Sequence, residues 1–230
     1  MKASAIIVAA GGGSRLGRSE PKAFVALAGR TMLSWSLATI AQVKGIEEVV
    51  IAVPAGREVA ARREASTLSI PVKITPGGAE RQDSVQIALA LTSAQSELVV
   101  IHDAARPLAS AQIFEACLAA ANRAGGAIAA IPVADSLKRV DAGHAISATV
   151  PRSDLWQAQT PQAFRRALIV AAHDRAMRDQ VTVTDDADLA ERIGTQVEVV
   201  ECTTPNLKIT TEADLELATA LLERQNRGRA

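Results

Sequence analysis

Residues 4–22 of the chain read SAIIVAAGGGSRLGRSEPK. A short apolar run is followed by consecutive glycines and then by arginines and a lysine. Apolar runs of this length predict a strand that is buried on both faces of a sheet. Glycines directly after such a strand let the backbone approach a ligand closely and turn its N–H groups toward phosphate oxygens. The stretch therefore predicts the first strand of an α/β sheet, with a phosphate-binding loop at its end.

The glycine loop does not match either common phosphate-binding motif. A Walker A loop requires GxxxxGK[ST], and residues 12–19 read GGSRLGRS, with Arg18 at the lysine position. The dinucleotide fingerprint GxGxxG fails because Leu16 occupies the position of its third glycine. What remains is a loop in which Arg15 and Lys22 could flank a triphosphate and stabilise negative charge that develops at phosphorus. The alternative is that both are solvated loop charges.

Apolar runs and helical patterns alternate along the chain. The expected strands are residues 4–9, 48–53, 71–75, 98–102, 127–133 and 197–201. The expected helices are residues 32–41, 57–66, 83–91, 111–124, about 163–177, a further one from 184, and 212–224. This alternation predicts a Rossmann-like, three-layer α/β fold in which a mostly parallel sheet is flanked by helices. Ligands bind such sheets at the carboxyl ends of the strands. No linker interrupts the pattern, so residues 1–230 are expected to form one domain.

One segment departs from the alternation. Residues 135–149, DSLKRVDAGHAISAT, hold two short half-polar strand patterns around a DAG turn at 141–143. This predicts a β-hairpin arm at about 135–152 that projects from the body. A turn is expected after it, at the TPQ of residues 160–162.

Composition excludes several classes of partner. The chain has 25 basic and 25 acidic side chains, 2% aromatic residues and no tyrosine. A zero net charge gives no general attraction to nucleic acid or to anionic membranes. No apolar stretch approaches the length of a membrane span. Cys117 and Cys202 belong to no metal-binding or disulfide pattern. We therefore expect a cytoplasmic protein that binds small molecules, without a nucleic-acid or membrane partner.

Three further segments follow expected strands. PGGAERQDSV (residues 76–85) contains two glycines and Arg81, although Asp83 or Ser84 could simply be the N-cap of the next helix. HDAARP (residues 102–107) places Asp103 at the carboxyl end of a buried strand, where a carboxylate can hold hydrated Mg²⁺ or a ribose hydroxyl. NLK (residues 206–208) adds Lys208, a further cation for an anionic substrate.

Together these segments carry a family resemblance. AAGGGSRLG, PK, GGAERQDSV, HDAARP, DSLK, WQAQTPQ, TDDA and NLKIT occur in this order between about Ala3 and Leu222. In this the chain resembles the 2-C-methyl-D-erythritol 4-phosphate cytidylyltransferase family of the non-mevalonate isoprenoid pathway. The resemblance implies transfer of a cytidylyl group from CTP to 2-C-methyl-D-erythritol 4-phosphate, with Mg²⁺ as cofactor and pyrophosphate as the leaving group. It also implies a homodimer held together by the arm.

The resemblance implies a role for each matching position. Arg15 and Lys22 match the catalytic basic pair. The nucleotide-binding positions are Ala9, Ala10, Gly11, Gly12, Gly13, Gly78, Arg81, Ser84 and Asp103. The acceptor-binding positions are Asp103, Arg106, Ser136, Arg152, Thr160, Thr184 and Lys208. Asp103 is also the position nearest the metal, which is held mainly by the nucleotide phosphates. Ser136 and Arg152, on the arm, would reach the site of the partner subunit.

Two departures and two alternatives accompany this interpretation. Ser136 stands where the family often has Thr, and Ala79 stands where an acidic residue is frequent, so a side-chain role at 79 is absent. Relatives fused to a zinc-dependent cyclase exist, but this sequence has no Asp-x-His pair, so we expect the transferase activity alone. The first alternative is a cytidylyltransferase for another polyol phosphate, such as ribitol 5-phosphate. The second is a regulatory module that binds nucleotide without turnover.

Overall fold

The computed structural model describes residues 2–13, 16–18 and 20–227. Its central sheet has the spatial order β11-β7-β10-β6-β1-β4-β5. These strands are β1 (Ala3–Val8), β4 (Ile46–Val53), β5 (Val72–Pro76), β6 (Leu98–Asp103), β7 (Gly125–Pro132), β10 (Trp156–Arg165) and β11 (Gln196–Glu201). β10 pairs antiparallel with both of its neighbours, and every other pairing in this sheet is parallel. The predicted α/β class with a mostly parallel sheet is confirmed.

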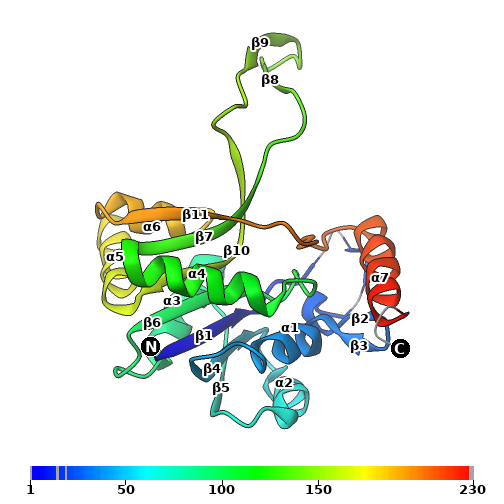
Figure 1. Ribbon diagram of the computed structural model, residues 1–230, viewed down its shortest axis with the longest axis vertical. Coiled ribbons are helices and arrows are strands. Elements are labelled where there is room, and N and C mark those ends of the chain that lie inside the picture. Colours follow the sequence, from blue (N-terminus) through cyan, green and yellow to red (C-terminus); the bar gives the residue numbers. More distant parts are fainter. Residues whose placement is uncertain (1, 14–15, 19, 228–230) are drawn as a thin grey trace.

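Helices cover both faces of the sheet (Figure 1). On one face, α1 (Met32–Ile40), α2 (Glu58–Glu64) and α4 (Ala111–Ala124) share a buried apolar cluster with Ala5 and Ile7 of β1. On the other face, α3 (Arg81–Leu91), α5 (Arg166–Asp179) and α6 (Asp186–Arg192) share a second buried cluster with Ile6 of β1. Successive strand residues point to opposite faces, so a short apolar run supplies both layers of the core.

A smaller cluster closes the end of the sheet near the glycine loop. The C-terminal helix α7 (Glu212–Arg227) contributes Leu215 and Leu222, which pack with Leu27 of the short strand pair β2 (Ala26–Leu27) and β3 (Arg30–Thr31). The described residues also form two 3₁₀ turns: η2 (Lys22–Phe24), after the glycine loop, and η3 (Ala65–Thr67), after α2.

Helix boundaries follow the capping signals of the sequence. The Thr31 hydroxyl accepts a hydrogen bond from the Ser34 N–H at 3.0 Å and so caps α1. The α4 helix begins after Ser110, its N-cap, and ends at Gly125, which has a φ of 110°. Few side chains adopt this backbone conformation, which explains why glycine ends the helix.

The segment around Pro161 corrects the sequence-based expectation of a turn at 160–162 and a helix from about 163. Residues 156–165 form β10, and α5 begins only at Arg166. Proline normally argues against a central strand because it cannot donate to the ladder. Here the pairing of β10 with β7 shifts register between Ala158 and Gln162, so Pro161 lies in an irregularity of the strand. The next helix, expected from 184, begins at Asp186 with Asp185 as its N-cap.

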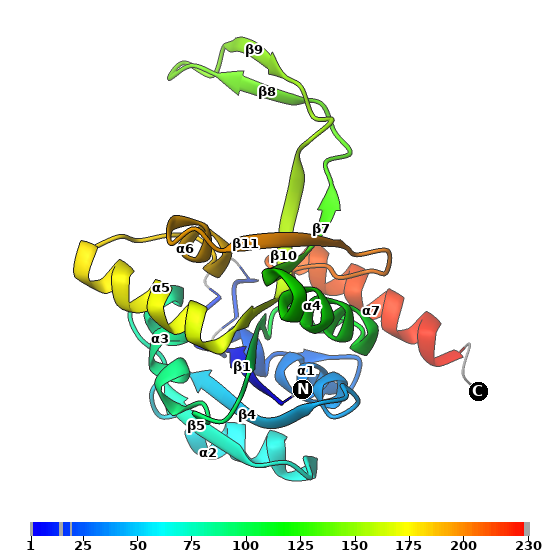
Figure 2. The same cartoon turned by 60° about the vertical axis from the view of Figure 1, so that its left-hand side comes forward.

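The expected hairpin is present as β8 (Leu137–Val140) and β9 (Ile146–Val150). Its turn is held by Asp141, whose Oδ1 accepts hydrogen bonds from the N–H groups of Gly143 and Ala145, each at 2.9 Å. Figures 1 and 2 show the hairpin standing well away from the body, beyond the ends of β7 and β10.

Candidate active site

A pocket of about 190 Å³ lies at the carboxyl ends of β1 and β6. From β1 the chain winds outward through β4 to β5 and then returns to place β6 on the other side of β1, so the pocket is at the switch point of the sheet. It is lined by Val8, Ala9, Ala10, Gly11, Lys22, Ala23, Gly78, Ala79, Glu80, Arg81, Ser84, Asp103, Ala104, Ala105 and Lys208. Three of these residues are cations and two are carboxylates, a balance that favours an anionic ligand.

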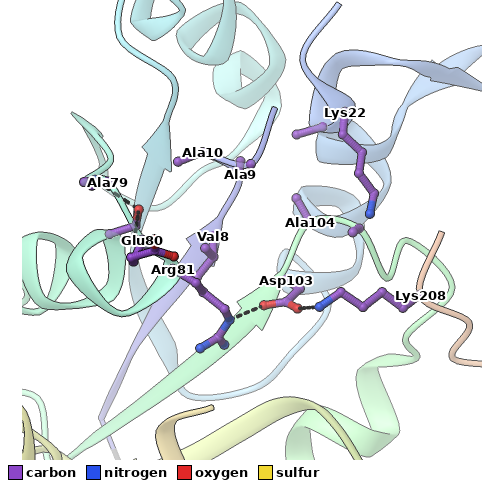
Figure 3. Close-up of a pocket in the computed structure, with 15 residues that line it drawn as sticks. Val8, Ala9, Ala10, Lys22, Ala79, Glu80, Arg81, Asp103, Ala104 and Lys208 are labelled. Carbon is purple, nitrogen blue, oxygen red and sulfur yellow. Dashed lines mark hydrogen bonds and ion pairs between the residues drawn. The ribbon is translucent and has the colours of Figure 1, made fainter. Parts of the chain in front are cut away.

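The glycine loop forms one wall of the pocket. Gly13 has a φ of 72°, and a Cβ on it would lie 2.6 Å from Cβ of Lys22, so the chain can approach Lys22 only with glycine at this position. Figure 3 shows the Lys22 side chain extending from η2 toward Ala104 and the region of Asp103 and Lys208. Gly11 lines the pocket, whereas Gly12 and Gly13 are not among its lining residues. Arg15, the predicted partner of Lys22, lies outside the described residues.

The second glycine segment forms the opposite wall. A Cβ on Gly77 would lie 2.3 Å from Cβ of Ala10, so the two loops touch at glycine. The Gly78 N–H donates to Oγ of Ser84 at 3.1 Å, which closes the turn before α3. The N-cap of this helix is Glu80 rather than the expected Asp83 or Ser84, and the helix begins at Arg81. Arg81 therefore stands on the first turn of α3 and reaches across the pocket.

Asp103 is the charged centre of the pocket. Its Oδ1 accepts a hydrogen bond from Nε of Arg81 at 2.9 Å, and its Oδ2 accepts one from Nζ of Lys208 at 2.7 Å (Figure 3). The Asp103 side chain is only 9% exposed, whereas that of Lys208 is 42% exposed. Burial by itself raises the pKa of Asp103, but the charges of Arg81 and Lys208 outweigh it and hold that pKa well below its usual range. The site therefore presents a carboxylate held between two cations.

A buried network of polar side chains continues from Arg81 into the interior. Nη1 of Arg81 donates to Oδ2 of Asp186 at 2.8 Å, and Oδ1 of Asp186 lies 3.1 Å from Nε2 of His173. Asp186 and His173 are 1% and 2% exposed. Burial raises the pKa of Asp186, but Arg81 and His173 lower it by more than burial raises it, so the carboxylate stays ionised. Asp186 thus braces the guanidinium that holds Asp103.

This buried network could not be predicted from the sequence. Asp186 occurs there only within the TDDA segment of the family resemblance, and no motif marks His173. A second anchor was also hidden: Oε1 of Gln162 accepts hydrogen bonds from the N–H groups of Asp186 and Ala187 at 3.1 and 3.2 Å. The signal that was available is TDDA, where two consecutive acids allow one to cap the helix while the other turns inward.

Two predicted acceptor-binding residues lie behind Asp103 rather than along the pocket. Thr160 and Arg106 are 4% and 9% exposed. Oγ1 of Thr160 accepts a hydrogen bond from the Asp103 N–H at 3.0 Å, and Nη1 of Arg106 donates to the Asn206 carbonyl at 2.8 Å. In this arrangement both residues support the loop that carries Asp103.

His102 completes that support. Its Nε2 lies 3.2 Å from the Arg106 carbonyl, and its Nδ1 lies 3.1 Å from Oγ1 of Thr160. Burial lowers the pKa of His102 to about 4, so the ring is neutral near pH 7. A carbonyl can only accept, so Nε2 carries the proton, and the Thr160 hydroxyl then donates to Nδ1.

The remaining predicted residues lie outside the pocket of their own chain. Ser136 and Arg152 are exposed on the arm, and Thr184 is exposed two residues before α6. None of the three is among the lining residues. Within the described part of the chain, no group of three or more His, Cys, Asp or Glu side chains is placed to hold a metal ion. The described helices include none that is both long and apolar enough to cross a membrane.

Comparison with known proteins gives a consistent result. The family described as "IspD: 2-C-methyl-D-erythritol 4-phosphate cytidylyltransferase" matches residues 3–224. The enzyme of that name from Deinococcus radiodurans is 44% identical, with 96% of this chain and 89% of the relative covered. The one from Syntrophus aciditrophicus is 40% identical over 97% of both chains.

Solved structures of the same kind share the fold. The crystal structure of the enzyme from Thermus thermophilus superimposes with a TM-score of 0.81 at 38% identity, covering 97% of this chain and 100% of that one. The synthase from Anaerococcus prevotii gives 0.85 at 31% identity, covering 96% and 98%. The chain belongs to the IspD family, the 2-C-methyl-D-erythritol 4-phosphate cytidylyltransferases.

Proposed function

We propose that the pocket at the ends of β1 and β6 is the site where this chain transfers the cytidylyl group of CTP to 2-C-methyl-D-erythritol 4-phosphate. An oxygen of the acceptor phosphate forms a bond to the α-phosphorus of CTP, while the bond from that phosphorus to the β-phosphate oxygen breaks. The products are 4-diphosphocytidyl-2-C-methyl-D-erythritol and pyrophosphate. The observation that carries the proposal is the convergence of Lys22, Arg81 and Lys208 on one pocket that contains the buried Asp103.

Lys22 is proposed as the cation that stabilises the reacting phosphorus. Its side chain extends into the pocket from the wall formed by the glycine loop (Figure 3). A fixed ammonium there would neutralise the negative charge that gathers on the α-phosphate oxygens as the new bond forms. Arg15 is the proposed second cation, on the strength of the family resemblance. The backbone of residues 9–11 and of 78 would hold the nucleotide from either side.

Lys208 is proposed to bind the acceptor phosphate. It is the more exposed of the two cations that hold Asp103, and it lines the pocket. An incoming phosphate dianion offers it a stronger electrostatic partner than a carboxylate, so binding of the acceptor would draw Lys208 away from Oδ2 of Asp103. Thr184 is proposed as a further contact, while Arg106 and Thr160 act through the Asp103 loop.

Mg²⁺ is proposed as the cofactor, and the residues present fit it in one way. Mg²⁺ is commonly held by one or two carboxylates together with substrate phosphates. Asp103 is a carboxylate kept ionised in the pocket, and each of its oxygens retains a lone pair beyond the one used by Arg81 or Lys208. Asp103 would hold the ion together with the triphosphate, and the ion would neutralise phosphate charge. Asp103 itself supplies a fixed negative charge that orients Arg81.

The arm is proposed to join two copies of the chain. Leu137, Val140, Ile146 and Trp156 on or beside it are 36–67% exposed. A two-stranded hairpin is marginally stable alone, and exposed apolar side chains of this kind mark an interface. In such a homodimer Ser136 and Arg152 would reach the site of the partner.

A cytoplasmic location is also proposed. The two cysteines, Cys117 and Cys202, are unpaired and buried, which supports the expectation of a reducing, cytoplasmic location.

The acceptor is tested by measuring pyrophosphate release from CTP and Mg²⁺ with 2-C-methyl-D-erythritol 4-phosphate or with ribitol 5-phosphate. We expect kcat/KM to be higher for the first by at least about 10²-fold, since a pocket built to hydrogen-bond one polyol rejects a mismatched one. A preference for ribitol 5-phosphate would overturn the proposed acceptor. Binding of CTP without any pyrophosphate release would instead indicate a regulatory module.

The shared site is tested by mixing two inactive variants, Arg152→Glu and Lys22→Ala. In a mixed dimer, the site with an intact Lys22 receives the intact arm of its partner, so half of the sites should regain activity. If subunits exchange, as shown by mass spectrometry, and no activity returns, the arm does not complete the partner's site.

A further inference from the structure

Asn206 lies in an irregular loop between β11 and α7, two residues before Lys208. It is 4% exposed, and its Nδ2 donates to Oε1 of Gln159 and to the Thr160 carbonyl, both at 2.9 Å. Its own carbonyl accepts the hydrogen bond from Arg106. These three hydrogen bonds, two from the side-chain amide and one to the main-chain carbonyl, hold the backbone of Asn206 in one place.

The rest of this loop has few other attachments. The Cys202 N–H donates to the Ala130 carbonyl at 2.8 Å, and the Ile209 N–H donates to the Ala105 carbonyl at 2.9 Å. Between these two points, among the described residues, the hydrogen bonds from the loop to the rest of the protein are those of Asn206 and the Lys208 ion pair itself. Asn206 is therefore the side-chain anchor of the loop on the N-terminal side of Lys208, and the buried Ile209 is the anchor on its C-terminal side.

The same bonds also fix the partner of Lys208. Thr160, whose carbonyl accepts from Asn206, uses its hydroxyl oxygen to accept the Asp103 N–H. Arg106, which donates to the Asn206 carbonyl, forms a turn with Asp103 through its own N–H at 2.9 Å from the Asp103 carbonyl. Asn206 is thus connected to both ends of the Asp103–Lys208 pair.

We propose that Asn206 is a positioning residue that sets Lys208 against Asp103 and so determines how the acceptor phosphate is received. The inference rests on the proposed role of Lys208 in acceptor binding. Asn206 does not line the pocket, so it acts through Lys208 and the Asp103 loop. Loss of its amide donors leaves a long, half-exposed lysine on a loop without that anchor, which raises the entropy lost when the phosphate is bound.

The test is a double-mutant cycle on kcat/KM for the acceptor at saturating CTP. We expect Asn206→Ala to lower it about 10-fold and Lys208→Met to lower it about 10²-fold, with the KM for CTP changed less than about 3-fold in Asn206→Ala. In the double variant, Asn206→Ala should add no more than about 2-fold to the loss from Lys208→Met. A purely structural role would give multiplied losses, and that result would overturn the inference.

Matched variants guard against a folding defect. Asn206→Asp keeps the shape but replaces the donor with an oxygen facing two acceptors, so it should behave like Asn206→Ala; wild-type activity would contradict the inference. Gln159→Met removes one acceptor only and should give a smaller loss in the same parameter, testing the same bond if Asn206→Ala fails to fold. Thr203→Ala, an exposed residue of the same loop, should leave kcat/KM unchanged. Normal activity of Lys208→Met would instead contradict the role of Lys208.

Discussion

Two buried carboxylates lie at opposite ends of the sheet and have different surroundings. Glu48, 6% exposed near the start of β4, accepts hydrogen bonds from Oγ of Ser4, from the Ser93 N–H and from Nζ of Lys73. Asp103, 6% exposed at the end of β6, accepts from Arg81 and Lys208 and lines the pocket. Both are ionised and both touch a lysine.

The two carboxylates differ in the other contacts that their hydrogen-bond partners make. Lys73 also donates to the Leu91 carbonyl at 2.7 Å, and Ser4 is hydrogen-bonded to Ser96 at 2.6 Å, so the Glu48 cluster ties β1, β4, β5 and the loop after α3 together. The partners of Asp103 themselves line the cavity. We infer a structural role for a buried carboxylate whose partners bind other groups of the protein. We infer a functional role for one whose partners line a cavity.

The largest difference between the two carboxylates is expected in catalysis, when Asp103 is replaced. We expect Asp103→Asn to lower kcat/KM by at least about 10²-fold, because the fixed charge between Arg81 and Lys208 is lost from the site. Pyrophosphate release measures it. The mirror variant Glu48→Gln should change kcat/KM by less than about 2-fold. Equal losses from the two variants would show that the distinction between the two carboxylates is wrong.

For the stability of the fold, Glu48 is expected to matter although it is expected to have little effect on catalysis. Glu48→Gln is expected to lower the free energy of unfolding by about 1–3 kcal/mol, since it removes buried, charge-assisted hydrogen bonds. Urea denaturation followed by circular dichroism measures this. Glu47→Gln, on the same strand but 53% exposed in its pair with Lys2, is the matched control and should stay within about 0.5 kcal/mol. A neutral Glu48→Gln would remove the structural role assigned to this cluster.

The buried brace behind Arg81 should have a smaller effect on catalysis. Asp186→Asn is expected to lower kcat/KM about 10-fold, because the guanidinium keeps Asp103 but loses a charged partner on its other side. Steady-state kinetics measure it, with Asp188→Asn as the control on the same helix, where the side chain is 43% exposed and pairs with Arg192. A loss with Asp188→Asn as large as that with Asp186→Asn would point to the helix rather than to the brace.

The pH dependence of stability should separate the two ends of the sheet. His102, beside Asp103, has a pKa lowered by burial from 6.5 to about 4, so the unfolded chain binds a proton there that the folded chain does not. Stability from this group is full above pH 6.5 and is lost as pH falls, by about 1 kcal/mol between pH 6.5 and 5.5. Urea titrations at several pH values should show this slope in wild type and a shallower one in His102→Gln.

The contribution of Glu48 belongs to a lower window. Burial raises its pKa, but the bonds from Ser4, Ser93 and Lys73 give a net lowering. Its stabilisation is therefore present above the unfolded value of about 4.3 and is lost only as pH falls below it. In Glu48→Gln, the slope of the free energy of unfolding against pH is therefore expected to be unchanged above pH 5.

The outcome that would contradict the assignment to His102 concerns the higher window. It is a slope between pH 6.5 and 5.5 that is the same in His102→Gln as in wild type.

Much of this architecture could be predicted from local patterns. Six strands, the helices expected at 32–41 and 111–124, and the hairpin each depend on a few neighbouring residues, and each was confirmed. The family and its reaction followed from motifs in their order. The β10 strand could not be predicted, because Pro161 argues against a central strand and only the pairing with β7 shows how it is accommodated.

The pocket was predicted in part. Asp103, Arg81 and Lys208 were each expected at strand ends, and the structure brings them together. Their bracing was not predictable, because Asp186 lies 105 positions from Arg81 in the sequence and the choice between capping a helix and pairing with an arginine is made by packing. The support of Lys208 by Asn206 was missed for the same reason.

The central claim is that the pocket holding Asp103 is where the phosphorus–oxygen bond is made. The most direct test is the single-turnover rate constant of Lys22→Ala at saturating CTP, Mg²⁺ and acceptor, with exposed Lys2→Ala as control. We predict a fall of about 10²-fold or more in Lys22→Ala and no change in the control. A near-normal rate constant in a folded Lys22→Ala variant, with only the KM raised, would contradict the claim that Lys22 acts on the reacting phosphorus.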